Sequence, residues 1–145
     1  MNKSFNILIA VCAVLFAAHG LHAILRAQTQ TVSDGVYTEA QATRGATVYA
    51  EQCASCHGED MTGVPDLFPA LIGETFATNW QGKSVGELFE KIILTMPALD
   101  PGSLLPLQVA DLVAHSLSSM TYPAGTAELV PDVEALKAIE INVPE

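Results

Sequence analysis

Apolar residues recur at helical spacing in three segments of the chain, and these segments predict its main helices. The first runs from a capping residue, Thr38, to Cys53, the second starts at Ser84, and the third spans about 106–119. Their buried faces follow the i, i+3, i+4, i+7 pattern: Ala42, Gly45, Ala46 and Tyr49, then Val85, Leu88, Phe89 and Ile92, then Ala110, Val113, Ala114 and Leu117. No segment shows the alternation of a strand, so the predicted fold class is all-α.

Capping residues and prolines mark where these helices begin and end. Ser84 and Glu87 have the spacing of a capping box, and two prolines after Thr95 prevent the second helix from continuing. Pro106 suits the first turn of the third helix. Residues 61–78 contain glycines and prolines without a sustained period, which predicts a long folded loop with about one turn of helix. Loops this long in a small domain need something to pack against, and a buried cofactor would serve.

The two ends of the chain differ from this helical region. Residues 1–27 combine Lys3, an unbroken apolar run and small residues near Ala23 and Ala27, which is the layout of a secretory signal peptide. Cleavage after Ala27, or alternatively after Ala23, would release the protein into the periplasm. A retained membrane anchor facing the periplasm is the alternative. We therefore divide the chain into a leader (1–27), a polar tether (28–37), a main domain (38–122) and a C-terminal extension (123–145) that wraps the surface, with a short helix near 133–139.

The charge of the chain limits its partners. It has 6 basic and 16 acidic residues and a net charge of −10. Removal of the leader would take Lys3 and Arg26 but no acidic residue, leaving a net charge of about −12. Binding of nucleic acid through its phosphates is excluded because there is no basic patch to neutralise them. A partner with a positive surface could be attracted.

The candidate chemistry lies in the sequence CASCH, residues 53–57. Without the leader, which holds Cys12, Cys53 and Cys56 are the only cysteines. A structural zinc site has all four positions closed by protein ligands. Besides the two cysteines, the zinc would need both remaining histidines, His57 and His115, which are far apart in the sequence. A thioredoxin-type couple would require a strand before the motif, where a helix is predicted. The spacing fits one covalently attached haem c, with both thiols bonded to the porphyrin and His57 as proximal iron ligand.

The second axial position decides between an electron carrier and a catalytic haem. Met61 lies only four residues beyond His57 and would have to reach around the macrocycle, while Met120 follows a helix, where a methionine usually packs. Met96 stands in a proline-braced loop 39 residues beyond His57, far enough to cross the haem. His115 lies on an apolar helix and is expected to pack. We favour Met96, whose thioether would raise the reduction potential.

The chain from about residue 38 to 139 resembles the class I c-type cytochromes, and most of all those associated with pyrroloquinoline-quinone-dependent dehydrogenases. Besides the haem motif, the resemblance is carried by NWQGKSVGELFEKI, TMPALDPGSL, VADLVAHSL and YPAGTAEL. It implies a small cytochrome c fold of three main helices and long loops around one haem, with the methionine ligand in the T-M-P loop. At His115 the family more often has an aromatic residue, which leaves the packing of the first helix against the third open.

The resemblance also implies roles for residues around the haem. The carbonyl of Pro69 would accept a hydrogen bond from His57, Leu71 would pack on the haem, and Trp80 would bond a propionate or simply pack in the core. The implied function is electron transfer, not catalysis, from a quinoprotein alcohol-type dehydrogenase toward a terminal oxidase. Two alternatives remain: a fixed haem relay subunit of a membrane-bound oxidoreductase complex, and a ligand-binding or catalytic haem with an open distal position.

Overall fold

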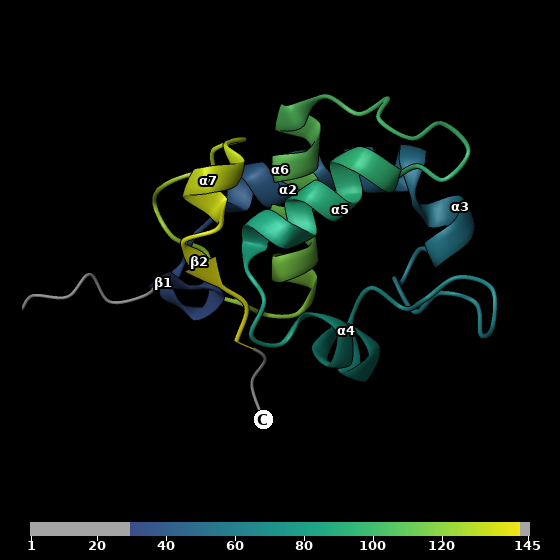
Figure 1. The fold of residues 1–145 in the computed structure, drawn as a ribbon, viewed down its shortest axis with the longest axis horizontal. Coiled ribbons are helices and arrows are strands. Elements are labelled where there is room, and N and C mark those ends of the chain that lie inside the picture. Colours follow the sequence, from purple (N-terminus) through teal and green to yellow (C-terminus); the bar gives the residue numbers. More distant parts are fainter. Residues whose placement is uncertain (1–29, 143–145) are drawn as a thin grey trace, which may run out of the picture.

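The computed structural model describes residues 30–142 and is mostly helical (Figure 1). In chain order the elements are β1 (Gln30–Thr31), η1 (Val32–Asp34), α2 (Glu39–Gln52), α3 (Ala54–His57), α4 (Gly73–Trp80), α5 (Val85–Thr95), α6 (Pro106–Ser119), α7 (Val133–Leu136) and β2 (Ile139–Glu140). The all-α prediction is confirmed. The predicted leader, residues 1–27, lies outside the described residues. Within 30–142, no helix is long and apolar enough to cross a membrane.

The three predicted main helices are α2, α5 and α6. Thr38 caps α2 by accepting a hydrogen bond from the amide of Gln41 at 3.1 Å. At the start of α5, the Ser84 hydroxyl accepts from the amide of Glu87 at 3.2 Å, and the Glu87 carboxylate accepts from the amide of Ser84 at 2.8 Å. Pro106 is the first residue of α6, where no amide hydrogen is needed. These caps satisfy backbone groups that the first helical turn leaves free.

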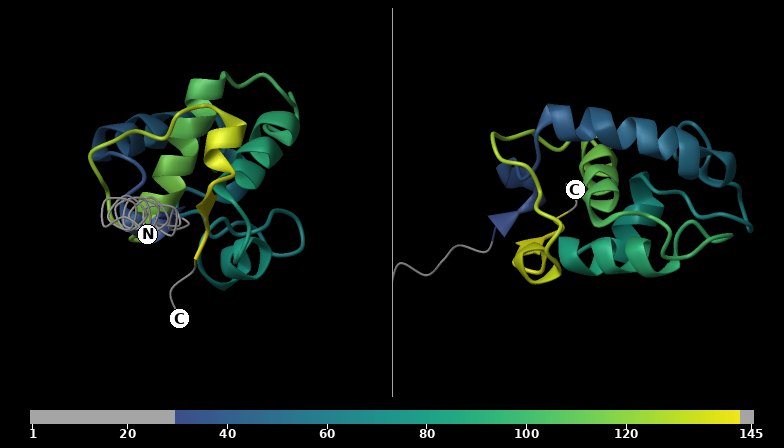
Figure 2. Two further views of the ribbon diagram at one scale, coloured as in Figure 1. Left: turned by 60° about the vertical axis from the view of Figure 1, so that its left-hand side comes forward. Right: turned by 90° about the horizontal axis from the view of Figure 1, so that it is seen from above.

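Helices α2 and α6 pack directly against each other (Figure 2), and Gly45 lies at their contact. A Cβ atom at this glycine would meet the backbone carbonyl of Asp111 and would lie 2.9 Å from Cβ of His115. The missing side chain therefore lets the two helix backbones approach. One turn further along α2, the Tyr49 ring lies tilted against the His115 ring with 5.4 Å between centroids. The sequence left open how the first helix packs against the third at His115. In the structure, His115 packs against Gly45 and Tyr49 of α2.

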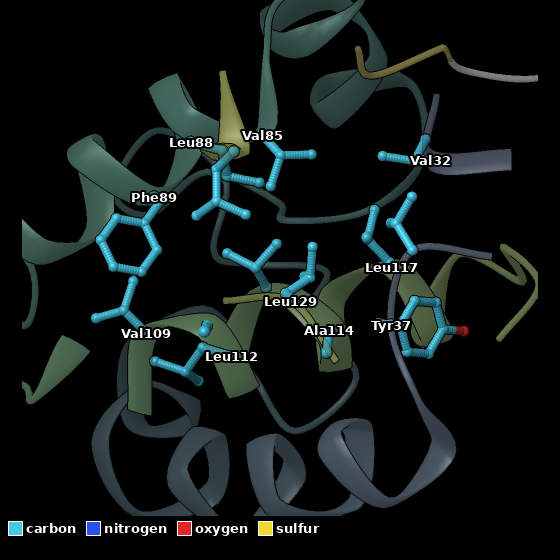
Figure 3. Packing of buried hydrophobic residues seen from close by; sticks show 14 of the residues in the cluster. Val32, Tyr37, Val85, Leu88, Phe89, Val109, Leu112, Ala114, Leu117 and Leu129 are labelled. Atoms are coloured by element: carbon cyan, nitrogen blue, oxygen red, sulfur yellow. The ribbon is translucent and has the colours of Figure 1, made fainter. Parts of the chain in front are cut away.

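The hydrophobic core joins α5, α6 and the segments at both ends of the described chain (Figure 3). Every member of the predicted α6 stripe is buried, and the α5 stripe is buried except for the half-buried Ile92. Val32 and Tyr37 enter the same core from the N-terminal segment, and Leu129 enters it from the C-terminal extension. The core thus depends on residues outside the three main helices.

Residues 30–37 differ from the predicted polar tether because they belong to the folded domain. Strand β1 pairs in parallel with β2, the only two named strands among residues 30–142, and Val32, Val36 and Tyr37 are buried. The Tyr37 hydroxyl donates to the carbonyl of Tyr122 at 2.6 Å. The apolar residues of this segment follow no helical period, so their burial becomes evident only when the C-terminal extension covers them.

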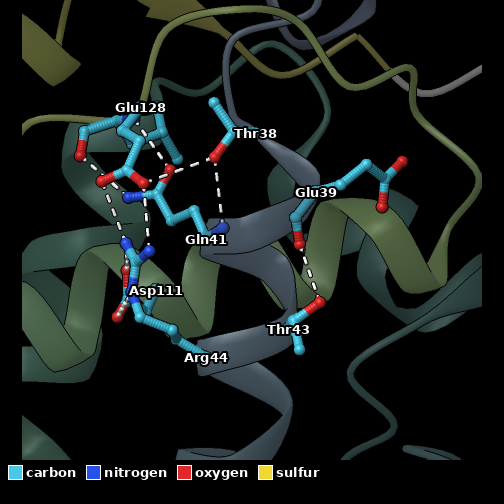
Figure 4. Close-up of polar contacts among 8 residues, drawn as sticks. Thr38, Glu39, Gln41, Thr43, Arg44, Asp111 and Glu128 are labelled. Atoms are coloured by element: carbon cyan, nitrogen blue, oxygen red, sulfur yellow. Dashed lines mark hydrogen bonds and ion pairs between the residues drawn. The ribbon is translucent and has the colours of Figure 1, made fainter.

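The C-terminal extension is held against α2 by a polar network (Figure 4). Gln41 is 1% exposed, and its side-chain amide donates to the carbonyl of Leu129 at 3.0 Å and accepts from the amide of Leu129 at 2.9 Å. Arg44 donates to the carboxylates of Asp111 and Glu128 at 2.9–3.0 Å. Its guanidinium lowers the pKa of Glu128 through these hydrogen bonds. The extension therefore does more than wrap the surface, because Leu129, Leu136 and Ile141 are buried in the core. Its short helix, α7, ends at Leu136, earlier than the predicted 133–139, because Ile139–Glu140 form β2.

Helix α4 is longer than the single turn predicted between residues 61 and 78. It spans eight residues, and Phe76 is buried while Trp80, four residues later, packs beside it with 6.3 Å between ring centroids. Ile72, Phe76 and Trp80 are spaced by four residues, a helical signal that the surrounding glycines and polar residues obscure. This helix follows the loop that carries Pro69.

Candidate functional site

One short helical turn carries both thiols and the imidazole of the CASCH motif. Helix α2 ends at Gln52, and α3 follows directly, with the amides of Cys56 and His57 both bonded to the carbonyl of Cys53 at 3.1 and 2.9 Å. Both cysteines are free thiols. Burial is the main cause that raises the pKa of Cys53 to about 11, and the neighbouring Cys56 adds to the effect. A helix therefore precedes the motif, as the sequence predicted.

Tyr49 fastens this turn to α2. Its hydroxyl donates to the carbonyl of Gly58, the residue after His57, at 2.6 Å, and burial is the main cause that raises its pKa to about 12. From the sequence, Tyr49 is expected only in the apolar stripe of α2. A buried tyrosine nearly always finds a partner for its hydroxyl, which was the available signal for this contact.

The His57 ring is oriented by a backbone carbonyl. Its Nδ1 atom lies 2.9 Å from the carbonyl oxygen of Pro69, the contact that the family resemblance implied. A carbonyl only accepts, so Nδ1 carries the proton and Nε2 keeps a lone pair for a metal. The Phe68 ring meets the His57 ring edge-on, with 6.2 Å between centroids.

A tightly folded loop holds Pro69 in place opposite His57. The amide of Gly63 donates to the carbonyl of His57 at 2.8 Å, and the amide of Leu71 donates to the carbonyl of Met61 at 2.8 Å. Gly63 has a φ of +71°, and a Cβ atom there would meet the carbonyl of Phe68 and lie 2.7 Å from the carbonyl carbon of Pro69. Glycine is therefore required both by the backbone conformation and by the close approach. No pattern in the sequence distinguishes Gly63 from the other glycines of this loop.

Leu71 and Trp80, predicted to contact the haem, are both half-buried and both pack against the hydrophobic core. Trp80 lies at the end of α4, and the ammonium of Lys83 lies 5.0 Å from the centroid of its ring. This distance is within the range of a cation–π interaction. The contact of Trp80 with a propionate stays a prediction, and its packing against Phe76 is the geometry observed.

Met96 differs from the other candidate axial ligands in its surroundings. It ends α5, is half-buried, and its amide donates to the carbonyl of Ile92 at 2.9 Å. Met61 is buried in the core, Met120 packs against the core, and His115 lies against Tyr49. Burial lowers the pKa of His115. The alternatives to Met96 therefore already have packing roles.

The end of α5 and helix α3 lie at the same end of the molecule, opposite α7 and β2 (Figures 1 and 2). The fold therefore brings the segment of Met96 to the end that carries Cys53, Cys56 and His57. These residues fit a covalently attached haem: two free thiols stand beside an imidazole whose Nδ1 is already hydrogen-bonded. The zinc alternative would need four ligands, whereas residues 30–142 hold no group of three or more His, Cys, Asp or Glu side chains that could bind a metal ion.

Comparison with known proteins identifies the family of the chain. The model of the family described as cytochrome c oxidase, cbb3-type, subunit III matches residues 40–115. Searches of curated proteins and of solved structures return no match. The matched segment runs from α2, through the CASCH motif and α5, to His115 in α6. Because it covers more than half of the chain, this protein belongs to that family and is a class I c-type cytochrome, a domain type that implies covalently bound haem c and electron transfer.

Proposed function

We propose that this protein is an exported monohaem cytochrome that carries single electrons in the periplasm from a quinoprotein alcohol-type dehydrogenase toward a terminal oxidase. The observation that carries the proposal is the hydrogen bond between His57 and Pro69, which leaves Nε2 of the motif histidine available to iron. Membership of the c-type cytochrome family supports electron transfer, and the resemblance of the segments around Trp80, Met96 and His115 supports the dehydrogenase as donor.

Each residue of the site has a role in this proposal. Cys53 and Cys56 would hold the haem through thioether bonds, and His57 and Met96 would ligate its iron. When bound, the haem supplies one-electron exchange between ferric and ferrous iron. The Pro69 carbonyl keeps the proton of His57 on Nδ1 and raises the basicity of the ligating nitrogen. With the iron held by both His57 and Met96, no position would remain for a substrate, which separates this proposal from a catalytic haem.

The attachment is tested by expressing the full chain together with an export and haem-ligation apparatus. Haem should stay with the polypeptide after denaturation, and Cys53→Ala together with Cys56→Ala should abolish this retention. The ferrous protein should not bind carbon monoxide if Met96 fills the distal position. Rapid binding of carbon monoxide by the wild-type protein would instead favour the ligand-binding alternative.

The donor is tested by adding the purified ferric protein to a periplasmic extract before and after an alcohol. Reduction that requires both the alcohol and pyrroloquinoline quinone supports the dehydrogenase partnership. Reduction by ascorbate alone would leave an electron carrier with a different donor and would contradict that part of the proposal.

A second candidate function is favoured by the family description, which names a subunit of an oxidase. The haem would then be a fixed relay within a membrane-bound oxidoreductase complex. N-terminal sequencing of the mature protein separates the two possibilities. Retention of residues 1–27 favours the relay, whereas a chain that starts at Gln28 or Ile24 favours a carrier released into the periplasm.

A further inference from the structure

Segments from the two ends of the described chain meet at the start of α5 (Figures 1 and 2). Strand β1 pairs with β2, and β2 is bridged in the antiparallel sense to the turn that precedes α5. There the amide of Ile141 donates to the carbonyl of Lys83 at 2.8 Å, and its carbonyl accepts from the amide of Gly82 at 2.9 Å. We call residues 30–34 and 132–142 the terminal clasp. Both segments lie outside the part of the chain that the family model matches.

Helix α7 of the terminal clasp rests on the first turn of α5 at Gly86. A Cβ atom at this glycine would lie 2.8 Å from the amide nitrogen of Lys137 and 2.9 Å from the carbonyl oxygen of Val133. The missing side chain therefore lets the two backbones touch. The ammonium of Lys137 also lies 3.7 Å from the carboxylate of Glu90, one turn further along α5. An exposed ion pair of this kind adds little, so the backbone contact at Gly86 is the main one.

The terminal clasp is itself fixed to the body of the protein. Val32, Leu136 and Ile141 are fully buried and belong to the hydrophobic core. The Tyr122 hydroxyl, which follows α6, donates to the carbonyl of Asn142 at 2.8 Å. The start of α5 is therefore held between two parts of the chain that are anchored independently of it.

Helix α5 connects the terminal clasp to Met96. Its 11 residues make it about 16 Å long, and Met96 follows its last residue. The buried residues of this helix all lie in its first half: Val85, Gly86, Leu88 and Phe89. A helix moves as a nearly rigid rod, so a tilt at its packed start displaces its other end, and rigid elements of this kind can couple distant sites.

We propose that the terminal clasp positions α5 so that Met96 stays on the haem iron, and that loosening the clasp makes Met96 easier to displace. The inference rests on the proposed function, in which Met96 is the distal ligand. Gly86 is then a positioning residue, because it acts through α5 and not by touching the haem. Linkage makes the effect reciprocal: displacement of Met96 loosens the clasp by the same factor by which an open clasp favours the displacement.

The first test titrates the ferric holoprotein with imidazole. An imidazole nitrogen replaces the Met96 sulfur on the iron without transfer of an electron, and loss of the sulfur-to-iron charge-transfer band measures the binding. Gly86→Ala pushes the backbone of the clasp away, so the apparent dissociation constant for imidazole should fall by about 3–10-fold. Alanine is the better helix former, so this change would not come from unfolding of α5 itself.

Thr38→Ala is the control for this titration. It removes the cap of α2 and destabilises the protein through a different helix. The Thr38 hydroxyl bonds to Gln41 and Glu128, which lie outside both α5 and the terminal clasp. The affinity of Thr38→Ala for imidazole should therefore equal that of the wild-type protein.

The second test uses the reciprocal effect and needs no variant. Amide hydrogen exchange is measured on the ferric wild-type protein with and without saturating imidazole. The amides of Gly82 and Ile141, which join the terminal clasp to the turn before α5, should lose about 3–10-fold of their protection when imidazole is bound. The amide of Leu129, which is bonded to Gln41 in α2, should keep its protection.

Two results would overturn the inference. One is a Gly86→Ala variant that is less stable in urea but binds imidazole like the wild-type protein, since the clasp would then be merely structural. The other is unchanged protection of Gly82 and Ile141 in the presence of imidazole, which decides alone if Gly86→Ala does not fold. Failure of the proposed function is seen separately and earlier, as a wild-type protein without the charge-transfer band or a Met96→Ala variant that keeps it.

Discussion

Replacing Gly63 by alanine tests whether the loop beside His57 sets the properties of the site. Gly63 has a φ of +71°, so alanine adopts a left-handed conformation that costs about 1–2 kcal/mol. Its Cβ atom would also press on the carbonyl of Phe68 and on Pro69, and overpacking of this kind costs about 1–3 kcal/mol. The free energy of unfolding should therefore fall by about 2–5 kcal/mol in total.

Gly82→Ala is the matched control. Gly82 has a φ of +75°, but nothing lies within 4 Å of the Cβ position, so this variant carries only the backbone strain of about 1–2 kcal/mol. Any loss of entropy in the unfolded chain is similar in both variants and cancels in the comparison. The difference between the two, measured by urea unfolding, isolates the close approach of Gly63 to the segment that holds Pro69.

The same pair of variants should differ in reduction potential. Moving the Pro69 carbonyl away from Nδ1 of His57 makes the ligating nitrogen less basic, which destabilises ferric iron and raises the potential. If the hydrogen bond favours the ferric state by about 0.5–1 kcal/mol, the shift is about 20–40 mV for one electron. A spectroelectrochemical titration measures it. If Gly63→Ala matched Gly82→Ala in both stability and potential, the positioning role given to this loop would be wrong.

Three further predictions concern the ligand, the C-terminal extension and pH. Met96→Ala should remove the sulfur-to-iron charge-transfer band and lower the potential, whereas Met120→Ala should keep the band and lose about 1–3 kcal/mol of stability through a packing defect. Gln41→Leu should destabilise the protein by about 2–4 kcal/mol in urea unfolding because both backbone groups of Leu129 lose their partner. Burial lowers the pKa of His115, so below about pH 6.5 the unfolded state accepts a proton that the folded state resists. Stability should therefore fall more in the wild-type protein than in His115→Phe between pH 7 and pH 5, and parallel urea midpoints would contradict this.

The main helices were predictable because their signals are local. The i, i+3, i+4 stripes, the Thr38 and Ser84 caps and Pro106 at the start of α6 each lie within a few residues of the element they define. The haem motif is equally local, since the spacing of Cys53, Cys56 and His57 is carried by a single turn. Helix α4 was underestimated because its apolar residues are only three and lie among glycines and polar residues.

Contacts between distant segments could not be predicted in the same way. The burial of Val32 and Val36 depends on a C-terminal extension about a hundred residues later, and the pairing of Gln41 with Leu129 joins residues 88 apart. A buried glutamine can pair with many backbone groups, so the sequence around Gln41 does not indicate that its partner is Leu129. The role of Gly63 was missed for another reason: Phe68 and Pro69 are only five and six residues away, but the loop between them has no regular period from which its backbone path could be predicted.

By itself, the sequence determined the fold class, the three main helices and the residues able to attach a haem, because helical periodicity and the C-x-x-C-H spacing are properties of neighbouring residues. Only the tertiary structure decided that residues 30–37 belong to the domain and that His115 packs on Tyr49. Burial and exposure depend on which surfaces meet when the chain closes on itself, and one segment read alone does not contain that information.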